Sequence, residues 1–550
     1  MDDLYVHDPK KGIVALPSRS LDLGGLQPSL EGRFEATLAD GRRIAVVEGA
    51  CDPREENPMA VASRLVPEER NPIDGRLVGA SNGGRFDNIN PATEESIGVC
   101  ADATRQDIET AIAAARRAFD TSDWSTNHAF RSRCLKQLCE ALDRSRELFR
   151  SVVVAEAGSP LLLTYAVQCD AYIDAMPYWA ELTTSYEYER DLSDIRFMGQ
   201  RQGRIMRREP VGVVGAITPW NFPLYLNLCK LGPALAAGNT VVLKPAPDTP
   251  WCATHIGRLI AEETDIPAGV VGIVASSSHQ LGAVLSSDPR VDLVTFTGST
   301  ETGRRVMAAG AATVKKIFLE LGGKSAAIAL DDADLGLVAG SAATVCTHAG
   351  QGCALQTRLL LPRSRYEEGL ELVQAAFAKL PYGDPTDPSK LMGPLISEKQ
   401  QDRVLGYIEK GVEEGARLVT GGRVPTHLPK GYFVEPTLFA DVDPDATIAQ
   451  EEIFGPVLCV IPYEDDDDAV RIANNSIYGL SGSVYSASIE RSLAVARRIR
   501  TGTLSINGAQ WFDVDTPFGG YRQSGVGREN GVQGFEEYLE TKVMGVPPTE

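Results

Sequence analysis

The sequence predicts an α/β protein built from two doubly wound parallel-sheet domains and a small exposed β element. Apolar strand patterns alternate with amphipathic helical patterns between residues 211 and 321, and a second such series runs from "SAAIALDDADL" to about residue 531. Between the helical first part and the first series, "SDIRFMGQRQGRIMRREP" (193–210) alternates polar and apolar residues, which is typical of an exposed hairpin. Because continuous apolar strands joined by helical crossovers form parallel sheets covered on both faces, each series indicates a doubly wound domain.

The predicted elements follow in chain order. Residues 1–69 are rich in Pro, Gly and charge and form an N-terminal extension, with a hairpin around Asp40 and Gly41. Two helices follow, over "RQDIETAIAAARRAFD" and over "RCLKQLCEALDRSRELFRSVVVAEAG", the second ending at Gly158. The strands of the first series read "VGVVGAIT", "NTVVLK", "VVGIVA", "VDLVTFTG" and "KKIFLEL". In the second series, the acidic run Glu464 to Asp468 is expected to start a helix, because negative charge suits a helix N-terminus.

Composition and charge exclude several classes of function. The 550 residues exceed what one hydrophobic core supports, and the net charge of −20 argues against a nucleic acid partner. The chain does not open on a basic segment followed by an apolar one, and no stretch of about 18 apolar residues occurs, so neither a signal peptide nor a membrane span is expected. The ten cysteines are scattered without a C-x-x-C pair, so we expect no disulfide framework and no metal site. A cytoplasmic location is predicted.

One cysteine is preceded by two closely spaced glycines. Cys353 lies in "HAGQGCALQT", with Gly350 and Gly352 just before it. Glycines add no packing, but they let backbone groups approach something closely. Cys353 has four interpretations, namely core filler, disulfide half, metal ligand or nucleophile. The scattered cysteines and the lack of a histidine cluster leave core filler and nucleophile.

Several turns at predicted strand ends carry candidate ligand-binding residues. "VDLVTFTGSTETG" runs from strand through a turn at Gly298 and Ser299 into a helix, and a helix N-terminus favours a phosphate. The spacing is not G-x-G-x-x-G, and "LELGGKS" is not a P-loop because Phe318 stands where that motif needs glycine. Lys244 follows a strand in "LKPAPDTP" and is interpreted either as an exposed lysine or as a ligand contact at the carboxyl end of a sheet.

Three further residues have both a chemical and a structural interpretation. Asn221 in "TPWNFP" is held between prolines and either donates to a developing oxyanion or bonds its own backbone in a turn. Glu320 in "LELGG" projects at a strand end, where a carboxylate can activate water if burial raises its pKa. In "QEEIFGPV", Glu452 and Phe454 precede a Gly-Pro turn and suit a sugar hydroxyl contact and an aromatic wall.

These segments occur together in one known family. PWNFP, KPA, FTGSTETG, LELGGKS, GQGC, EEIFGP and "PFGGYRQSGVGRE" stand here in the order found in the aldehyde dehydrogenase superfamily. The chain resembles that superfamily from about Asn71 to about Val546. The resemblance implies a Rossmann-like NAD(P)-binding domain (70–192 and 211–321), a catalytic domain (322–531) and a bridging or oligomerisation element (193–210 and 532–550). A homo-oligomer, either a dimer or a homotetramer, is therefore expected.

The resemblance also implies roles for the catalytic candidates. Cys353 matches the nucleophile, which attacks an aldehyde to give a thiohemiacetal and then, after hydride transfer, a thioester. The Asn221 side chain and the backbone N–H of Cys353 would hold the oxyanion. Glu320 matches the general base that activates water, and Glu529, in "GRE", matches a position thought to relay protons onward.

For the cofactor, the resemblance points to contacts on both sides of a dinucleotide. Lys244 resembles the adenosine-ribose contact, Gly298 and Ser299 the pyrophosphate turn, and Glu452 and Phe454 the nicotinamide-ribose site, with Arg403 near that ribose. The remaining expected cofactor contacts are Ile217, Thr218, Pro219, Trp220 and Leu321. Many NAD-dependent members carry glutamate three residues after the motif lysine, where this chain has Pro247. We expect NAD, with NADP as the alternative, because no extra basic residue appears in "KPAPDTP".

The resemblance places the substrate channel on seven residues: Phe222, Cys229, Cys346, Thr347, Trp511, Phe512 and Phe518. Relatives that favour small aldehydes often have bulky aromatics where Cys229, Cys346 and Thr347 stand. The smaller side chains suggest a roomier channel for longer or aromatic aldehydes.

Three other functions compete with aldehyde oxidation to the acid. A coenzyme A-acylating dehydrogenase is disfavoured because members of that branch generally lack the glutamate found here at Glu320. A Cys/His hydrolase is disfavoured because His348, only five residues before Cys353, has no recognisable motif around it. A purely structural role is disfavoured because Cys353 and Glu320 are both present.

Overall fold

A computed structural model of the chain describes residues 65–547 and, before them, the backbone of residues 4–8, 12–16, 33–37 and 43–47. Two compact units are distinguished, Met1–Ala60 and Val61–Glu550. In the first unit β1 (Leu4–Asp8) pairs antiparallel with β2 (Gly12–Leu16), and β3 (Arg33–Thr37) with β4 (Arg43–Val47). The predicted turn at Asp40 and Gly41 lies outside the described residues.

The first large sheet of the second unit has six strands in the order β13-β12-β11-β14-β15-β23. Its first five strands run parallel, whereas β23 pairs antiparallel with β15. The strands are β11 (Val213–Ile217), β12 (Thr240–Lys244), β13 (Val271–Ile273), β14 (Leu293–Thr297), β15 (Lys316–Glu320) and β23 (Gly525–Val526). Each of the five apolar segments predicted as strands between 211 and 321 therefore forms one strand of a parallel sheet.

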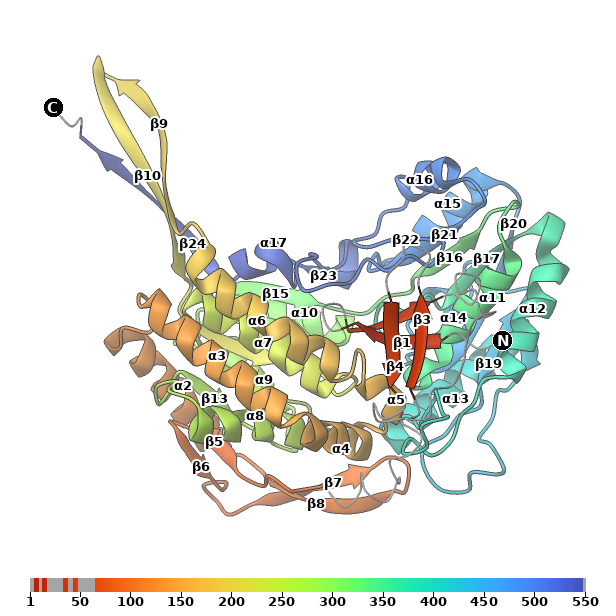
Figure 1. Ribbon diagram of the computed structural model, residues 1–550, viewed down its shortest axis with the longest axis horizontal. Helices are drawn as coiled ribbons and strands as arrows, with labels where there is room; N and C mark the ends of the chain where they lie inside the picture. Colours follow the sequence, from red (N-terminus) through yellow and green to blue (C-terminus); the bar gives the residue numbers. More distant parts are fainter. Residues whose placement is uncertain (1–3, 9–11, 17–32, 38–42, 48–64, 548–550) are drawn as a thin grey trace. The chain divides into compact units, whose positions relative to one another are not determined.

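Helices cover both faces of this sheet (Figure 1). From β11 the chain steps in one direction to β12 and β13, and then in the other to β14 and β15. Since crossovers between parallel strands are right-handed, the two directions place their helices on opposite faces. The helices packed on the strands are α7 (Pro223–Ala237) and α8 (Pro250–Glu263) on one face, and α2 (Arg105–Thr121), α9 (Gln280–Ser287) and α10 (Thr300–Gly310) on the other.

An outer helical layer covers α7 and α8. It consists of α3 (His128–Arg144), α4 (Arg146–Ala157), α5 (Leu161–Thr164) and α6 (Asp170–Ser185). The single helix predicted to end at Gly158 is therefore wrong, because the chain breaks at Ser145 into α3 and α4. The Ser145 N–H donates to the carbonyl oxygen of Leu142 at 3.0 Å, three residues back, which closes the last turn of α3. The second helix does end at Gly158, which has φ +62°.

The second large sheet has seven strands in the order β18-β19-β20-β17-β16-β21-β22, all parallel except the β18–β19 pair. The strands are β16 (Ala326–Ala329), β17 (Arg358–Pro362), β18 (Arg417–Thr420), β19 (Thr437–Ala440), β20 (Val457–Tyr463), β21 (Gly482–Tyr485) and β22 (Ser505–Ile506). The chain again steps in both directions from β16, so this sheet is also doubly wound.

The helices of the second sheet begin with α11 (Leu335–Ala343), α12 (Tyr366–Ala378), α13 (Glu398–Glu413) and α14 (Thr447–Gln450), and end with α15 (Asp466–Asn474) and α16 (Ile489–Ala496). The predicted helix start at the acidic run is confirmed, because the Asp465 side chain accepts from the Asp468 N–H at 2.9 Å. Short 3₁₀ turns lie at η3 (Ala311–Thr313), η4 (Thr344–Gly350), η5 (Arg363–Arg365) and η6 (Arg522–Ser524). The last helix is α17 (Gly531–Glu536).

Smaller β elements complete the second unit. The predicted hairpin is present as β9 (Glu189–Phe197) and β10 (Gln200–Pro210), and β24 (Leu539–Val546) pairs with β10. These three strands extend as a separate sheet beside the helical layer (Figure 1). Two further hairpins are β5 (Asn71–Ile73) with β6 (Arg76–Val78), and β7 (Arg85–Asn90) with β8 (Glu95–Ala101).

One segment differs from the predicted domain boundaries. Residues 322–531 are predicted as one domain, but β23 within them pairs with β15 of the first sheet. The boundaries otherwise stay predictions. Among the helices described, none is long and apolar enough to cross a membrane.

Candidate active site

The segment before Cys353 folds into a turn that only glycine can complete. His348, Ala349 and Gly350 all have positive φ, at 51°, 54° and 73°. A Cβ atom on Gly350 would lie 2.0 Å from the carbonyl oxygen of Gly455, so a side chain would meet a backbone that cannot move aside. The close approach expected from the glycines is therefore real at Gly350, and its partner is another backbone segment. Cys353 follows this turn and is half-buried.

Glu320 and Cys353 lie close enough to affect each other's pKa. Glu320 ends β15, is 2% exposed, and its Oε1 has no hydrogen-bond partner among the described residues. Burial raises the pKa of Glu320 to about 8, with the Glu529 carboxylate adding to the rise and the Cys353 thiol opposing it. Burial also raises the pKa of the Cys353 thiol well above its usual range, and the charges of Glu320 and Glu452 add to this rise. The two groups are therefore placed to exchange a proton.

Asn221 lies against the same segment. Its Nδ2 donates to the carbonyl oxygen of Gln351, two residues before Cys353, at 2.9 Å, and the residue is 4% exposed. An amide nitrogen carries two hydrogens, so one remains for another acceptor. The structure thus brings together Cys353, Glu320 and Asn221, from three segments that are far apart in the sequence.

Glu529 forms a buried ion pair that was not predicted from the sequence. Its carboxylate bonds Lys230 of α7, with side-chain exposures of 3% and 0%, and it also accepts from the Cys229 thiol. The Thr297 hydroxyl donates to Glu529 at 3.4 Å, and the Lys230 ammonium lies 4.5 Å from the ring centroid of Phe318. A signal for Lys230 was present, because it is the only charged residue of α7.

The expected cofactor contacts of the first sheet gather at the carboxyl ends of its parallel strands. Ile217 ends β11, Lys244 ends β12, and Gly298 and Ser299 follow β14, where the Ser299 hydroxyl caps helix α10. The Lys244 ammonium donates to the Pro245 carbonyl oxygen at 3.0 Å, and burial lowers its pKa to about 8. The other members are Thr218, whose hydroxyl donates to Asn227 at 2.6 Å, Pro219, Trp220 and Leu321.

The remaining cofactor candidates come from α13 and from the loop before β20, and Phe454 of this loop meets Trp220. The Trp220 and Phe454 rings pack edge to face, with centroids 5.4 Å apart. Glu452 accepts from the Gly323 N–H at 3.0 Å, and Arg403 donates to the Glu452 carbonyl oxygen at 2.7 Å. A Cβ atom on Gly322 would lie 2.2 Å from Glu452 Oε2, so the glycine pair makes room for this carboxylate. Burial raises the pKa of Glu452 to about 7.

The four aromatic channel candidates are connected by a chain of ring contacts that passes through Tyr225. Ring centroids lie 5.8 Å apart for Tyr225 and Phe512, 5.6 Å for Phe512 and Trp511, and 5.7 Å for the stacked pair Trp511 and Phe518. Phe222 joins this chain through Tyr225, at 6.5 Å. Tyr225, and Tyr172 at 4.7 Å from it, were not predicted, because aromatic residues on apolar helices look like core residues.

The three small channel candidates lie differently from one another. Cys229 is 2% exposed and contacts Glu529, and Thr347 is half-buried. Cys346 is fully buried, with its sulfur 3.9 Å from the carbonyl oxygen of Pro456. The Cys346 side chain therefore packs against the 455–456 turn.

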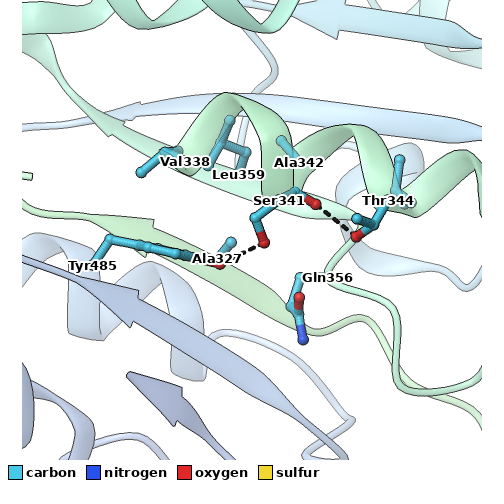
Figure 2. Close-up of a pocket in the computed structure, with 9 residues that line it drawn as sticks. Ala327, Val338, Ser341, Ala342, Thr344, Gln356, Leu359 and Tyr485 are labelled. Carbon is cyan, nitrogen blue, oxygen red and sulfur yellow. Dashed lines mark hydrogen bonds between the residues drawn. The ribbon is translucent and has the colours of Figure 1, made fainter. Parts of the chain in front are cut away.

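A further hollow lies between α11 and the strands beneath it (Figure 2). The Tyr485 and Ser341 hydroxyls share a hydrogen bond of 2.5 Å across it, and Thr344 donates to the Ser341 carbonyl oxygen at 2.6 Å. None of its lining residues is a site candidate. In the part of the chain that the structure describes, no group of three or more His, Cys, Asp or Glu could hold a metal ion.

Comparison with known proteins identifies the family. The sequence model of the aldehyde dehydrogenase family matches residues 78–544. The chain belongs to the aldehyde dehydrogenase family. It is 43% identical over 478 residues to a 3-succinoylsemialdehyde-pyridine dehydrogenase of a Pseudomonas species, covering 86% of this chain and 98% of the relative.

Solved structures agree with this assignment. An aldehyde dehydrogenase of Mycobacterium tuberculosis complexed with NAD+ is 43% identical, with a TM-score of 0.84, over 88% of this chain and 99% of that one. A betaine aldehyde dehydrogenase of Staphylococcus aureus in complex with NAD+ is 35% identical, with a TM-score of 0.84, over 89% and 96%.

Membership in the aldehyde dehydrogenase family confirms the predicted fold class and the predicted enzyme, an NAD(P)-dependent aldehyde dehydrogenase. The roles of individual site residues stay predictions, and the geometry above supplies the contacts from which they are argued.

Proposed function

We propose that this aldehyde dehydrogenase oxidises an aldehyde to a carboxylic acid with NAD+, through a thiohemiacetal and a thioester on Cys353. One observation supports the proposal most strongly: the Cys353 thiol lies near the buried carboxylate of Glu320, and the Asn221 amide beside them has one hydrogen left to donate. A thiol that merely fills a core needs neither of the other two groups.

The residues divide the reaction between them. The Cys353 thiol gives its proton to Glu320, and its sulfur bonds the aldehyde carbon. The carbonyl oxygen becomes an oxyanion that accepts from the free Asn221 N–H and from the Cys353 backbone N–H. Glu320 then takes a proton from water as the water oxygen attacks the thioester, and the sulfur leaves as thiolate. In this proposal Glu529, which is paired with Lys230 and whose charge raises the pKa of Glu320, receives the proton that Glu320 must release.

The cofactor residues fit a dinucleotide. Bound NAD+ supplies the hydride acceptor that converts the thiohemiacetal to the thioester. Glu452, supported by Gly322 and Gly323, suits the nicotinamide ribose, with Phe454 and Arg403 beside it. The N-terminus of α10 at Ser299 suits the pyrophosphate, and Lys244 suits the adenosine ribose. The NAD+ complexes of the two similar enzymes support NAD, whereas Pro247 keeps NADP as the alternative.

For the substrate, we propose a longer or aromatic aldehyde. The chain of rings from Phe222 through Tyr225 to Phe518 offers aromatic faces rather than charge. One relative is named for the semialdehyde of a pyridine, which is an aromatic ring. Rates along a series of aldehydes of increasing chain length test this, and a strong preference for acetaldehyde contradicts it.

The test of the function is a panel of aldehydes with NAD+ and with NADP+, following absorbance of the reduced nicotinamide. We expect reduction with NAD+ for at least one longer or aromatic aldehyde, and none with Cys353→Ala. A Cys353→Ala variant that oxidises aldehydes at the parent rate contradicts the proposal.

Two alternatives give different products in the same panel. Acyl-CoA formed on adding coenzyme A would assign the enzyme to the acylating branch, against which the presence of Glu320 counts. Ester hydrolysis without any reduction of NAD+ or NADP+ would support the hydrolase alternative. The hydrolase alternative would need His348 as the base, but His348 bonds the carbonyl oxygen of Asn221 rather than Cys353.

We also propose a homo-oligomer, a dimer or a tetramer, formed through β9, β10 and β24. Edge strand β9 ends at Phe197, which is 59% exposed, and Met198 in the following turn is 88% exposed. Exposed strand edges and apolar groups are commonly covered by another subunit. The cytoplasmic location stays a prediction.

A further inference from the structure

Hydrogen bonds join Asn221 and the segment before Cys353 into a closed ring. The His348 imidazole bonds the backbone carbonyl oxygen of Asn221 through Nε2 at 2.8 Å. The Asn221 side chain donates to the backbone carbonyl oxygen of Gln351 at 2.9 Å. The Gln351 backbone N–H and side-chain amide both donate to the carbonyl oxygen of His348, each at 3.1 Å. The ring therefore ties the loop after β11 to the turn that carries Cys353.

The direction of each bond is fixed by chemistry. A carbonyl oxygen only accepts, so His348 must carry its proton on Nε2. Its Nδ1 is buried and has no hydrogen-bond partner among the described residues, which agrees with a lone pair there. Burial lowers the pKa of His348 to about 4, so the imidazole is neutral near pH 7.

A second donor meets the same carbonyl oxygen from the helical layer. Gln168, between α5 and α6, donates through Nε2 to the Asn221 carbonyl oxygen at 3.0 Å. Gln168 is fully buried and its Oε1 has no partner in the described part of the chain. A buried acceptor without a partner, such as Gln168 Oε1, costs free energy. Asn221 is thus held by two donors at its backbone and by one acceptor at its side chain.

We propose that His348 and Gln168 are positioning residues that hold the Asn221 amide at a fixed place beside Cys353. The proposal rests on the proposed function, in which Asn221 donates to the oxyanion. Both side chains are buried, and each acts on Asn221 rather than on the substrate. Each donates to the main-chain carbonyl oxygen of Asn221. His348 also accepts from Gln351, whose carbonyl oxygen accepts from the Asn221 side chain. Catalysis by a hydrogen-bond donor needs the donor already in place, so loosening Asn221 slows steps that form an oxyanion.

Variants at His348 separate the donor from the volume of the ring. His348→Phe keeps a ring without a donor. His348→Asn suits the positive φ of this position but places its amide where Nδ1 stands, so the bond to Asn221 is lost. His348→Gln places an amide where Nε2 stands and keeps the bond. Gln168→Met removes the second donor at nearly constant volume.

The matched control is His255 of α8. It is fully buried, bonds the Val66 carbonyl oxygen through Nε2 at 2.8 Å, and has an unpartnered Nδ1, as His348 has. Its bond lies away from Asn221 and Cys353, so His255→Phe measures the cost of losing such a histidine without loosening the oxyanion donor.

Three readouts are compared: aldehyde oxidation, hydrolysis of p-nitrophenyl acetate, and alkylation of Cys353 by iodoacetamide. The first two form an oxyanion and the third does not. We expect kcat/KM for oxidation and hydrolysis to fall about 10- to 100-fold in His348→Phe, His348→Asn and Gln168→Met, which is less than the loss from deleting an oxyanion donor outright. Alkylation should stay within about twofold, and His348→Gln should recover most of the loss.

Each other outcome has a definite meaning. Oxidation at the parent rate in His348→Phe and Gln168→Met overturns the proposal, as does an equal fall in alkylation and oxidation, which indicates a general structural role. Equal losses in His255→Phe also overturn it. If the parent protein oxidises no aldehyde, the proposed function fails instead, and ester hydrolysis still reports whether His348 positions Asn221.

Discussion

The thiol proposed as the nucleophile and the carboxyl proposed as its base both have raised pKa values. Burial raises the pKa of the Cys353 thiol and brings that of Glu320 to about 8. Three carboxylates, those of Glu320, Glu452 and Glu529, add to the rise at Cys353. A raised pKa disfavours the thiolate, so in the proposed mechanism the sulfur becomes reactive when Glu320 takes its proton.

This arrangement predicts how activity depends on pH. Glu320 acts as a base only when ionised, and burial raises its pKa to about 8, so the active form increases as pH rises from 7 to 9. We expect kcat to rise across this range. Glu320→Gln should lower kcat by about 100-fold or more and remove the rise. Steady-state assays from pH 6 to 10 measure both effects, and a flat profile in the parent enzyme contradicts the assignment of Glu320 as the base.

The ion pair of Lys230 with Glu529 makes a prediction about stability. Both side chains are buried, so removing Lys230 leaves an unpaired charge. Lys230→Met should lower the free energy of unfolding by about 3–5 kcal/mol. Lys230→Met combined with Glu529→Gln should lose less, because no buried charge then remains. Urea denaturation of the three proteins measures this, and a double variant less stable than Lys230→Met contradicts it.

At this scale the sequence predicted residue types better than residue partners. Cys353, Glu320 and Asn221 stand in recognisable motifs, and the structure brings them together. Lys230 meets Glu529 across 299 positions, a pairing that no local pattern encodes. His348 and Gln168 show no motif either, because their role depends on a backbone oxygen of Asn221.

At the scale of elements, the turn before Cys353 is the most constrained segment of the site. Gly350 combines a positive φ of 73° with a backbone oxygen 2.0 Å from where its Cβ would be, and Gly455 supplies that oxygen. The turn thus docks against the 455–456 turn, which lies just after Glu452 and Phe454. The proposed nucleophile and the residues proposed for the nicotinamide ribose are therefore parts of one packed arrangement.

Gly350→Ala should consequently disable the enzyme as well as destabilise it. Strain and the backbone clash together should cost at least about 1–3 kcal/mol and displace Cys353, so oxidation should fall about 10-fold or more. Gly415→Ala is the control, since Gly415 has φ +90° but nothing within 4 Å of its Cβ position. It should lose about 1 kcal/mol of stability and keep its activity. Thermal unfolding and activity assays distinguish the two, and equal activity in both variants contradicts the argument.

The accuracy of the predicted elements follows their length and pattern. The five parallel strands of the first sheet were predicted because buried strands are short continuous apolar runs between helices. The break at Ser145 was missed because a single serine leaves the helical periodicity unchanged. β23 was missed because a two-residue strand carries no pattern, and its partner β15 lies about 200 residues earlier in the chain.

At the scale of the whole molecule, the sheet formed by β9, β10 and β24 carries the surface that we propose for subunit contact. β10 is paired on both sides, whereas β9 and β24 are its edges. Ile195 and Phe197 of β9, with Met198 in the turn, are exposed at 39%, 59% and 88%, and Val543 of β24 at 57%. Covering such side chains yields about 25 cal/mol for each Å² of apolar surface removed from water.

A charged variant of this sheet tests the proposed oligomer. Phe197→Asp combined with Met198→Asp places two carboxylates where apolar side chains would be buried between subunits, so the assembly should dissociate into smaller species. Light scattering after gel filtration gives the mass of parent and variant under the same conditions. Val314→Asp is the control, because Val314 is 92% exposed on a turn after α10 and lies outside β9, β10 and β24. We expect the control to keep the parent mass, and a doubly charged variant of unchanged mass would place the subunit contact elsewhere.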